Sequence, residues 1–155
     1  LGIYESRIYA RDCEVREVSS SEARIFLEIN HLQGYVPSSF RIGLYYNDKL
    51  IQLLCFGKNR FKRDEIELLR MCTKLDTQVV GGFSKLLSYQ PYDNFISYVD
   101  LSKFDASGYL KTGFQIISQS SPNYKYIKKN RMVNRLQAQK HKLPRLLTNF
   151  DNSKT

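Results

Sequence analysis

The sequence lacks the features that would place this protein in a membrane or outside the cell. No hydrophobic run approaches the roughly 18 residues that a membrane-spanning helix needs. The opening segment, Leu1 to Tyr4, has neither the basic nor the apolar region of a signal peptide. The three cysteines, Cys13, Cys55 and Cys72, are odd in number and widely separated, which argues against a disulfide framework. We therefore expect a soluble intracellular protein with reduced, buried thiols.

Acidic residues are absent from a long part of the chain. Between Ala106 and Phe150 there is no Asp or Glu, although the chain as a whole has 24 Lys and Arg, 15 Asp and Glu and a net charge of +9. This stretch instead carries nine cations, namely Lys111, Lys125, Lys128, Lys129, Arg131, Arg135, Lys140, Lys142 and Arg145. The rest of the chain has 15 basic and 15 acidic residues, so the whole excess lies in the C-terminal third. Such a distribution is expected of a neutral globular body with a basic face, and it predicts an anionic partner.

The remaining composition is that of an ordinary globular domain. Hydrophobic residues make up 42% and aromatic residues 13%, which is enough to fill one core in a chain of 155 residues. These values exclude disorder and collagen. We expect a single domain over residues 1–155. Because the chain begins at Leu1 rather than at methionine, we also expect it to be part of a longer protein.

Turn residues and apolar periodicity predict the order of the helices and strands. The first half is predicted to contain an edge strand at Ile8–Val18, a helix from Ser19 to His31, a hairpin of Ile42–Tyr46 with Leu50–Phe56, and a strand at Ile66–Cys72. The second half is predicted to contain a glycine turn at Val79–Gly82 before a helix to Leu87, strands at Phe95–Asp100, Phe114–Ser118 and Asn123–Lys128, and helices at Tyr109–Thr112 and Val133–Lys142. This order predicts a mixed α/β (α+β) domain, with a central, mostly antiparallel sheet flanked by helices and a basic C-terminal extension.

Five short motifs follow one another along these elements. They are Asn30-His31, Glu67-Leu68-Leu69-Arg70, Gly81-Gly82, Ser97-Tyr98-Val99-Asp100, and Tyr109 with Gly113-Phe114. Their order and spacing resemble the acyltransferase-like domain of the GNAT superfamily, and more narrowly the phage Mom type of DNA-modification protein. With Pro122–Tyr126 and Gln139–Leu143 added, the chain is also similar to a domain of phage Hef-like homing endonucleases. The resemblance implies a phage protein in the cytoplasm of the infected bacterial host, with a nuclease domain upstream of this one.

The glycine turn is where the resemblance places acyl-coenzyme A. In GNAT enzymes this turn and the next helix N-terminus bind the coenzyme's pyrophosphate through backbone N–H groups. The resemblance implies binding of acetyl-CoA or another acyl-CoA by Val80, Gly81, Gly82, Ser84 and Lys85. Phe83, however, occupies the last small position of the family's pattern. The alternative is that the glycines only form a tight strand-to-helix turn.

The resemblance also implies a reacting centre formed by Asn30, His31, Asp100 and Tyr109. Histidine acts as an acid or base near neutral pH, and Mom-like proteins place an Asn-His pair beside the reacting centre. Asp100 would lie in the central cleft, and Tyr109 resembles the tyrosine that GNAT enzymes use as a proton donor to the leaving thiolate. Each residue also has a structural alternative: a helix C-cap for Asn30 and His31, a turn cap for Asp100 and a core aromatic for Tyr109.

The acid-free segment predicts contacts with nucleic acid, because its tyrosines alternate with cations. Aromatic rings stack on bases, and cations neutralise phosphates. We expect residues 120–150 to contact duplex DNA, together with a second cluster formed by Lys58, Arg60, Lys62 and Arg63. The predicted nucleic-acid-binding residues are Lys58, Arg60, Tyr124, Lys125, Tyr126, Lys128, Lys129, Arg131, Arg135, Lys140 and Lys142. The alternative is that the lysines serve solubility while the tyrosines pack inward.

The sequence contains no convincing nuclease or metal-binding constellation. The run Asp64–Glu67 is more typical of a solvated turn entering a strand than of a metal site. Cleavage would therefore belong to an upstream domain. The favoured hypothesis is a DNA-binding accessory domain of a phage homing-endonuclease-type protein. The alternatives are an active acyltransferase-type enzyme that modifies DNA bases, and a protein-interaction module whose basic segment meets an acidic partner.

Overall fold

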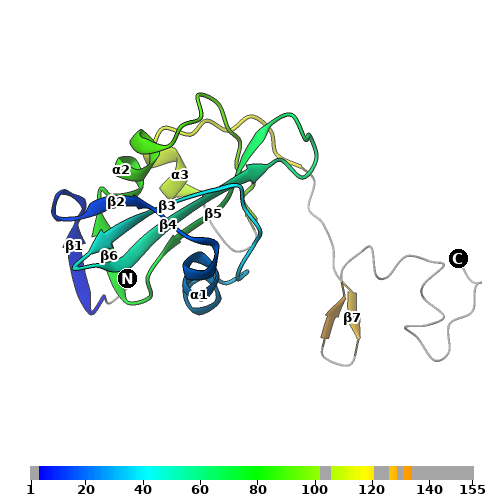
Figure 1. Cartoon of the computed structure of the whole chain (residues 1–155). Helices are drawn as coiled ribbons and strands as arrows, with labels where there is room; N and C mark the ends of the chain where they lie inside the picture. Colours follow the sequence, from blue (N-terminus) through cyan, green and yellow to red (C-terminus); the bar gives the residue numbers. More distant parts are fainter. Residues whose placement is uncertain (1–3, 102–105, 121–125, 129–130, 134–155) are drawn as a thin grey trace, which may run out of the picture. The chain divides into compact units, whose positions relative to one another are not determined.

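The computed structural model describes residues 4–101 and 106–120, together with the backbone of two short strands at 126–128 and 131–133. The chain divides into two compact units, Leu1–Phe114 and Gln115–Thr155. All helices in the described ranges are too short or too polar to cross a bilayer. The first unit contains the sheet and the helices that flank it (Figure 1).

The centre of the first unit is an antiparallel sheet with the strand order β2-β3-β4-β5. Its strands are β2 (Glu14–Glu17), β3 (Phe40–Tyr46), β4 (Lys49–Lys58) and β5 (Ile66–Thr73). The predicted hairpin is confirmed, since β3 pairs antiparallel with β4 across Asn47 and Asp48, whose φ angles are 49° and 60°. Two consecutive left-handed residues form a tight turn whose twist matches that of the strands, and Asn and Asp tolerate this conformation.

Two helices cover opposite faces of this sheet (Figure 1). Helix α1 (Ser20–Asn30) begins as predicted, with the Oγ of Ser19 accepting a hydrogen bond from the backbone N–H of Glu22 at 3.2 Å. Its buried side chains Ala23, Phe26 and Leu27 pack with Tyr45, Leu50, Leu53, Cys55 and Cys72 of the sheet. On the other face, Leu86 of α2 (Gly82–Tyr89) packs with Leu44, Leu54, Phe56 and Leu68. The predicted fold class, a mostly antiparallel sheet flanked by helices, is confirmed.

The predicted edge strand Ile8–Val18 is wrong in one respect, because a short helix interrupts it. The segment consists of β1 (Ser6–Tyr9), the 3-10 helix η1 (Ala10–Asp12) and β2. β1 leaves the main sheet and pairs in parallel with β6 (Thr77–Val80), the strand that leads into the glycine turn. Alternating polarity alone does not distinguish one long strand from two short ones that have different neighbours.

The chain after α2 is less regular than its sequence predicts. Instead of a strand at Phe95–Asp100 there is one parallel bridge between Ile96 and Glu67 of β5. The predicted short helix is present as α3 (Ser107–Lys111), but the predicted strand Phe114–Ser118 is absent, and Ile116 and Ile117 are exposed. Among the described residues no strand pairs with Ile116 and Ile117, so these apolar side chains stay exposed to water.

The second unit contains a short antiparallel hairpin. Its strands are β7 (Tyr126–Lys128) and β8 (Arg131–Val133), with Lys128 opposite Arg131. β7 confirms the end of the strand predicted at Asn123–Lys128. Val133, the first residue of the predicted helix Val133–Lys142, is the last residue of β8. The rest of that predicted helix lies outside the described residues.

Candidate nucleic-acid interface

The turn between β4 and β5, residues 58–65, brings cations and an aromatic ring together, and we call it the basic-aromatic loop. Asn59, only 1% exposed, holds it. The Oδ1 of Asn59 accepts hydrogen bonds from the backbone N–H groups of Phe61 at 2.9 Å and Lys62 at 3.4 Å. Its Nδ2 donates to Glu65 at 3.1 Å and to the hydroxyl of Tyr98 at 3.2 Å. One buried amide thus determines the path of the loop backbone.

Arg60 is anchored to β5 by a buried carboxylate. The side chain of Glu67 is 1% exposed, and its Oε1 accepts a hydrogen bond from Nη2 of Arg60 at 3.0 Å. Its Oε2 accepts from the backbone N–H of Arg60 at 3.2 Å. A buried carboxylate is costly unless it is paired and hydrogen-bonded, so Glu67 ties Arg60 to the sheet while the guanidinium side chain stays 61% exposed.

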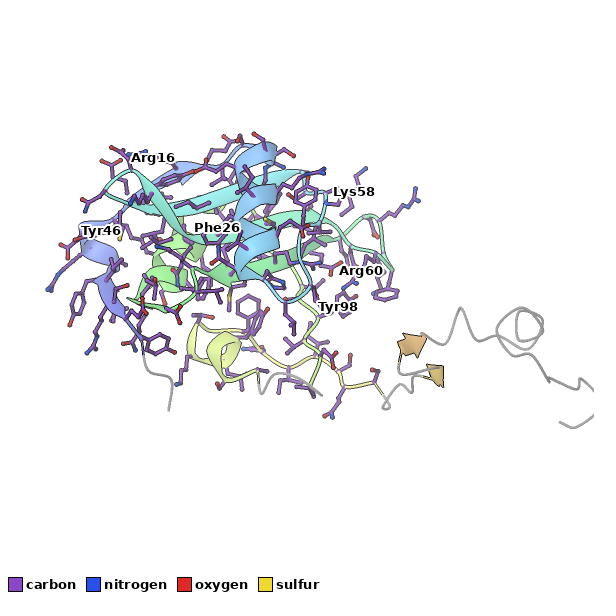
Figure 2. The ribbon with its side chains drawn as sticks, turned by 90° about the horizontal axis from the view of Figure 1, so that it is seen from below. Arg16, Phe26, Tyr46, Lys58, Arg60 and Tyr98 are labelled. Atoms are coloured by element: carbon purple, nitrogen blue, oxygen red, sulfur yellow. The ribbon has the colours of Figure 1, made fainter. Side chains whose placement is uncertain are left out.

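Phe61 presents its ring to solvent beside these anchored groups. The residue is 74% exposed. Its ring and that of Tyr98 form a T-shaped pair, with centroids 5.2 Å apart and planes at 75°. The guanidinium carbon of Arg60 lies 5.9 Å from the centroid of Phe61 and 5.7 Å from that of Tyr98. Figure 2 shows Arg60, Tyr98 and Lys58 at one end of the unit, with Arg16 and Tyr46 at the opposite end.

The loop has more cations than accessible acids. Lys58, Lys62 and Arg63 are exposed together with Phe61. Lys62 forms an ion pair with Glu65 at 3.3 Å, with both side chains substantially exposed, so the pair is weak and exchanges readily for another anion. The arrangement provides an aromatic surface and cations on a backbone that is already ordered.

The other predicted nucleic-acid-binding residues belong to the second unit. Tyr126 and Lys128 are in β7, and Arg131 is in β8. The rest, Tyr124, Lys125, Lys129, Arg135, Lys140 and Lys142, lie outside the described residues.

Asn30 and His31 end α1 and support the turns around it. Asn30 donates from Nδ2 to the carbonyl of Phe26 at 2.9 Å and accepts at Oδ1 from the backbone N–H of Leu75 at 2.9 Å. Nδ1 of His31 accepts from the backbone N–H of Gln33 at 3.1 Å. Burial, followed by the charge of Arg70, lowers the pKa of His31 from its ordinary value of 6.5. These contacts are those expected of the structural alternative.

Tyr109 packs on the opposite side of the sheet from α1. It joins the cluster beneath α2, and its ring lies 5.3 Å from that of Phe114 at 88°. Asp100 is exposed at the end of the first described range, in a segment without regular structure. The catalytic roles of these residues and of the Asn-His pair stay predictions.

Arg70 of β5 is a partly buried cation on the sheet. Its Nε donates to the carbonyl of Gly34 at 3.0 Å, and its charge acts on His31. The pKa of Arg70 is lowered, first by burial and then by Arg60, whereas Tyr109 acts in the opposite direction.

The predicted glycine turn is present between β6 and α2, and the side chain of Gln52 packs against it. Gly81, with a φ of 74°, caps α2, and its carbonyl accepts from the backbone N–H of Lys85 at 3.1 Å. A Cβ at Gly82 would lie 1.8 Å from Oε1 of Gln52, so the absent side chain makes room for Gln52. This Oε1 is the buried side-chain oxygen without a hydrogen-bond partner among the described residues.

Lys85 does not point its charge toward a phosphate at this turn. Its Nζ donates to the carbonyl of Ala10 at 2.9 Å and to that of Cys13 at 2.7 Å, at the end of η1. Phe83 packs against the apolar cluster beneath α2. The Nζ of Lys85 is therefore engaged by these two carbonyls. The roles of Val80, Gly81, Gly82, Ser84 and Lys85 in binding acyl-CoA stay predictions.

Comparisons with known proteins add one structural likeness. No family model matches the sequence, and no curated protein matches it. The chain is similar to an aminoglycoside acetyltransferase. That protein comes from an uncultured soil metagenomic sample and was crystallised with trehalose. The match has 10% sequence identity and a TM-score of 0.49, and it covers 76% of this chain and 98% of that one.

Two residues of this candidate interface, Asn59 and Phe61, carry no prediction from the sequence, and Glu67 is predicted only as part of a motif. Phe61 was not singled out, although a phenylalanine among four cations in a turn is an available signal. Asn59 has no such signal, and the motif that contains Glu67 does not indicate its contact with Arg60, because both roles depend on burial. In the described part of the chain no group of three or more His, Cys, Asp or Glu side chains is arranged to bind a metal ion.

Proposed function

We propose that this protein binds DNA through the basic-aromatic loop and the basic segment 120–150. The observation that carries the proposal is the loop itself, in which Asn59 and Glu67 hold Phe61 and Arg60 at the surface. A loop that is ordered before binding loses little conformational entropy when a ligand binds. Its exposed cations suit phosphate groups, and its ring suits the face of a base.

The role as an accessory domain of a phage homing-endonuclease-type protein is the finer part of this proposal. It is supported by the motif resemblance, and it assigns cleavage to another domain of a longer chain. The active acyltransferase hypothesis is not part of the proposal, because the side chain of Lys85 is engaged by the carbonyls of Ala10 and Cys13 and Phe83 occupies the last small position of the family's pattern.

The test is the salt dependence of DNA binding by the full chain. We expect the affinity for a mixed-sequence duplex to fall steeply with salt, because cations that neutralise phosphates release bound counterions. In a K58Q/R63Q variant the slope of log affinity against log salt should decrease by about 0.9 for each lost phosphate contact. The slope is measured by fluorescence anisotropy with a labelled duplex.

A K49Q/K74Q variant is the matched control, since it removes the same number of charges from exposed lysines. Lys49 begins β4 and Lys74 follows β5, so both lie at the end of the hairpins remote from the loop. Equal loss of affinity in the two variants would show that net charge alone attracts DNA. No salt dependence in the unmodified protein would contradict the proposal.

A further inference from the structure

The exposed ring of Phe61 is not needed for the packing of the loop. Three quarters of the residue faces solvent, and the loop backbone is held by Asn59 rather than by the ring. Its ring contacts are with Tyr98 and Arg60. Because the ring contributes little to the packing of the loop and lies beside the partly exposed ring of Tyr98 and the side chain of Arg60, it forms an aromatic surface that is open to a ligand.

The surroundings of the ring indicate the chemistry of that ligand. Tyr98 and Phe61 form a T-shaped pair, so Tyr98 does not lie flat against the ring of Phe61 as a stacked partner would. Arg60 is held nearby by Glu67, and its planar guanidinium is exposed. Lys58, Lys62 and Arg63 provide positive charge on the same loop. A planar group linked to phosphates matches this set of side chains.

We propose that Phe61 stacks on an unpaired base, so that the basic-aromatic loop recognises single-stranded or locally unpaired nucleic acid. This inference rests on the proposed function and deepens it. In a regular duplex the base faces are covered by neighbouring bases, and a ring reaches them only where a base is unstacked. Stacking of this kind is tolerant of sequence, so the loop selects unpaired structure rather than a base sequence.

The absence of tryptophan from the chain makes this site directly observable. A Phe61→Trp variant places a single indole at the loop, and stacking on a base quenches its emission. We expect oligothymidylate, or a duplex with one bulged thymidine, to quench the emission strongly at saturation. A blunt duplex bound to the same extent should quench it little. Anisotropy of the labelled nucleic acid measures the extent of binding in each case.

A Tyr46→Trp variant is the control reporter. Tyr46 is exposed at 37%, and Figure 2 places it at the opposite end of the unit from Arg60 and Tyr98. Its emission should be unchanged by all three nucleic acids. Equal quenching at both positions would report a nonspecific effect and overturn the inference.

Affinity gives the second readout. Phe61→Leu should weaken binding of oligothymidylate on the order of ten-fold and leave the blunt duplex within about two-fold, while Phe61→Tyr should retain binding. The melting temperature of each variant shows whether it is folded.

The outcomes separate the inference from the proposed function. Equal affinity of Phe61→Leu and the unmodified protein for unpaired and paired DNA, with K58Q/R63Q still weakened, would overturn the inference and leave DNA binding standing. Loss of salt-dependent binding to every nucleic acid would contradict the proposed function itself. Binding to vesicles of anionic lipid that depends on Phe61, without binding to oligothymidylate, would show that a membrane surface is the partner and overturn the inference.

Discussion

Individual side chains decide which charges of the basic-aromatic loop are available. Lys58 and Arg60 are two residues apart in sequence, yet only Arg60 has its backbone and side chain bound to the buried Glu67. Similarly, the sequence predicts Lys85 as a phosphate ligand, but its ammonium group donates hydrogen bonds to two backbone carbonyls. The function of a cation therefore depends on which acceptors lie within its reach.

His31 gives the stability of the fold a predictable dependence on pH. Burial and Arg70 lower its pKa in the folded state below the ordinary 6.5, so protons bind preferentially to the unfolded chain. The contribution of His31 is fully present above pH 6.5 and is lost as the pH falls below it. We expect the urea midpoint to decrease between about pH 7.5 and pH 5.5.

A His31→Asn variant isolates this effect, because Asn retains an acceptor for the N–H of Gln33 and does not titrate. Its urea midpoint should decrease less over the same pH range. An identical decrease in both proteins would assign the pH dependence to other groups.

At the scale of elements, the turn from β6 into α2 has a glycine, Gly82, at a position where a side chain would meet Gln52. A Gly82→Ala variant brings a Cβ against Gln52, so we expect a loss of about 1–3 kcal/mol in the free energy of unfolding. Urea denaturation measures this loss. Gly108→Ala is the control, because the new Cβ in α3 has nothing within 4 Å and alanine favours a helix.

A double-mutant cycle identifies the cause of that loss. If the clash with Gln52 is responsible, Gly82→Ala should cost less in a Gln52→Ala background. Additive effects of the two substitutions would instead locate the strain outside Gln52, either at Cγ1 of Val79, which would lie 2.7 Å from the new Cβ, or in the backbone of the turn.

The elements predicted correctly are those determined by local patterns. Ser19 caps α1, and Asn47 with Asp48 turns the β3–β4 hairpin, because each acts on backbone groups a few residues away. The strand predicted at Phe114–Ser118 failed for the opposite reason. A strand needs a partner, and an apolar sequence does not specify whether one is nearby.

At the scale of the whole molecule, charge and core are divided between the two units. Residues 1–114 contain 15 basic and 14 acidic side chains, whereas residues 115–155 contain nine basic and one acidic. The two hydrophobic clusters found among the described residues consist of residues from the first unit. The first unit therefore has what it needs to fold, and the second has most of what attracts a polyanion.

Truncation after Phe114 tests this division. We expect the shortened chain to unfold cooperatively near the melting temperature of the full chain, because both clusters are retained. Its affinity for a blunt duplex should fall sharply, and the salt slope should decrease. Calorimetry measures the first result and anisotropy the second. Undiminished duplex binding would contradict a role for segment 120–150.

The sequence alone determined the fold class, the order of most elements and the location of the positive charge. Periodicity, capping and composition encode these properties in neighbouring residues. Only the tertiary structure decided which residues form a site. Asn59 meets Tyr98 across 39 positions, and Lys85 meets Ala10 across 75. Such contacts arise when strands and helices pack together, and no local pattern specifies the partners that packing brings to a buried polar group.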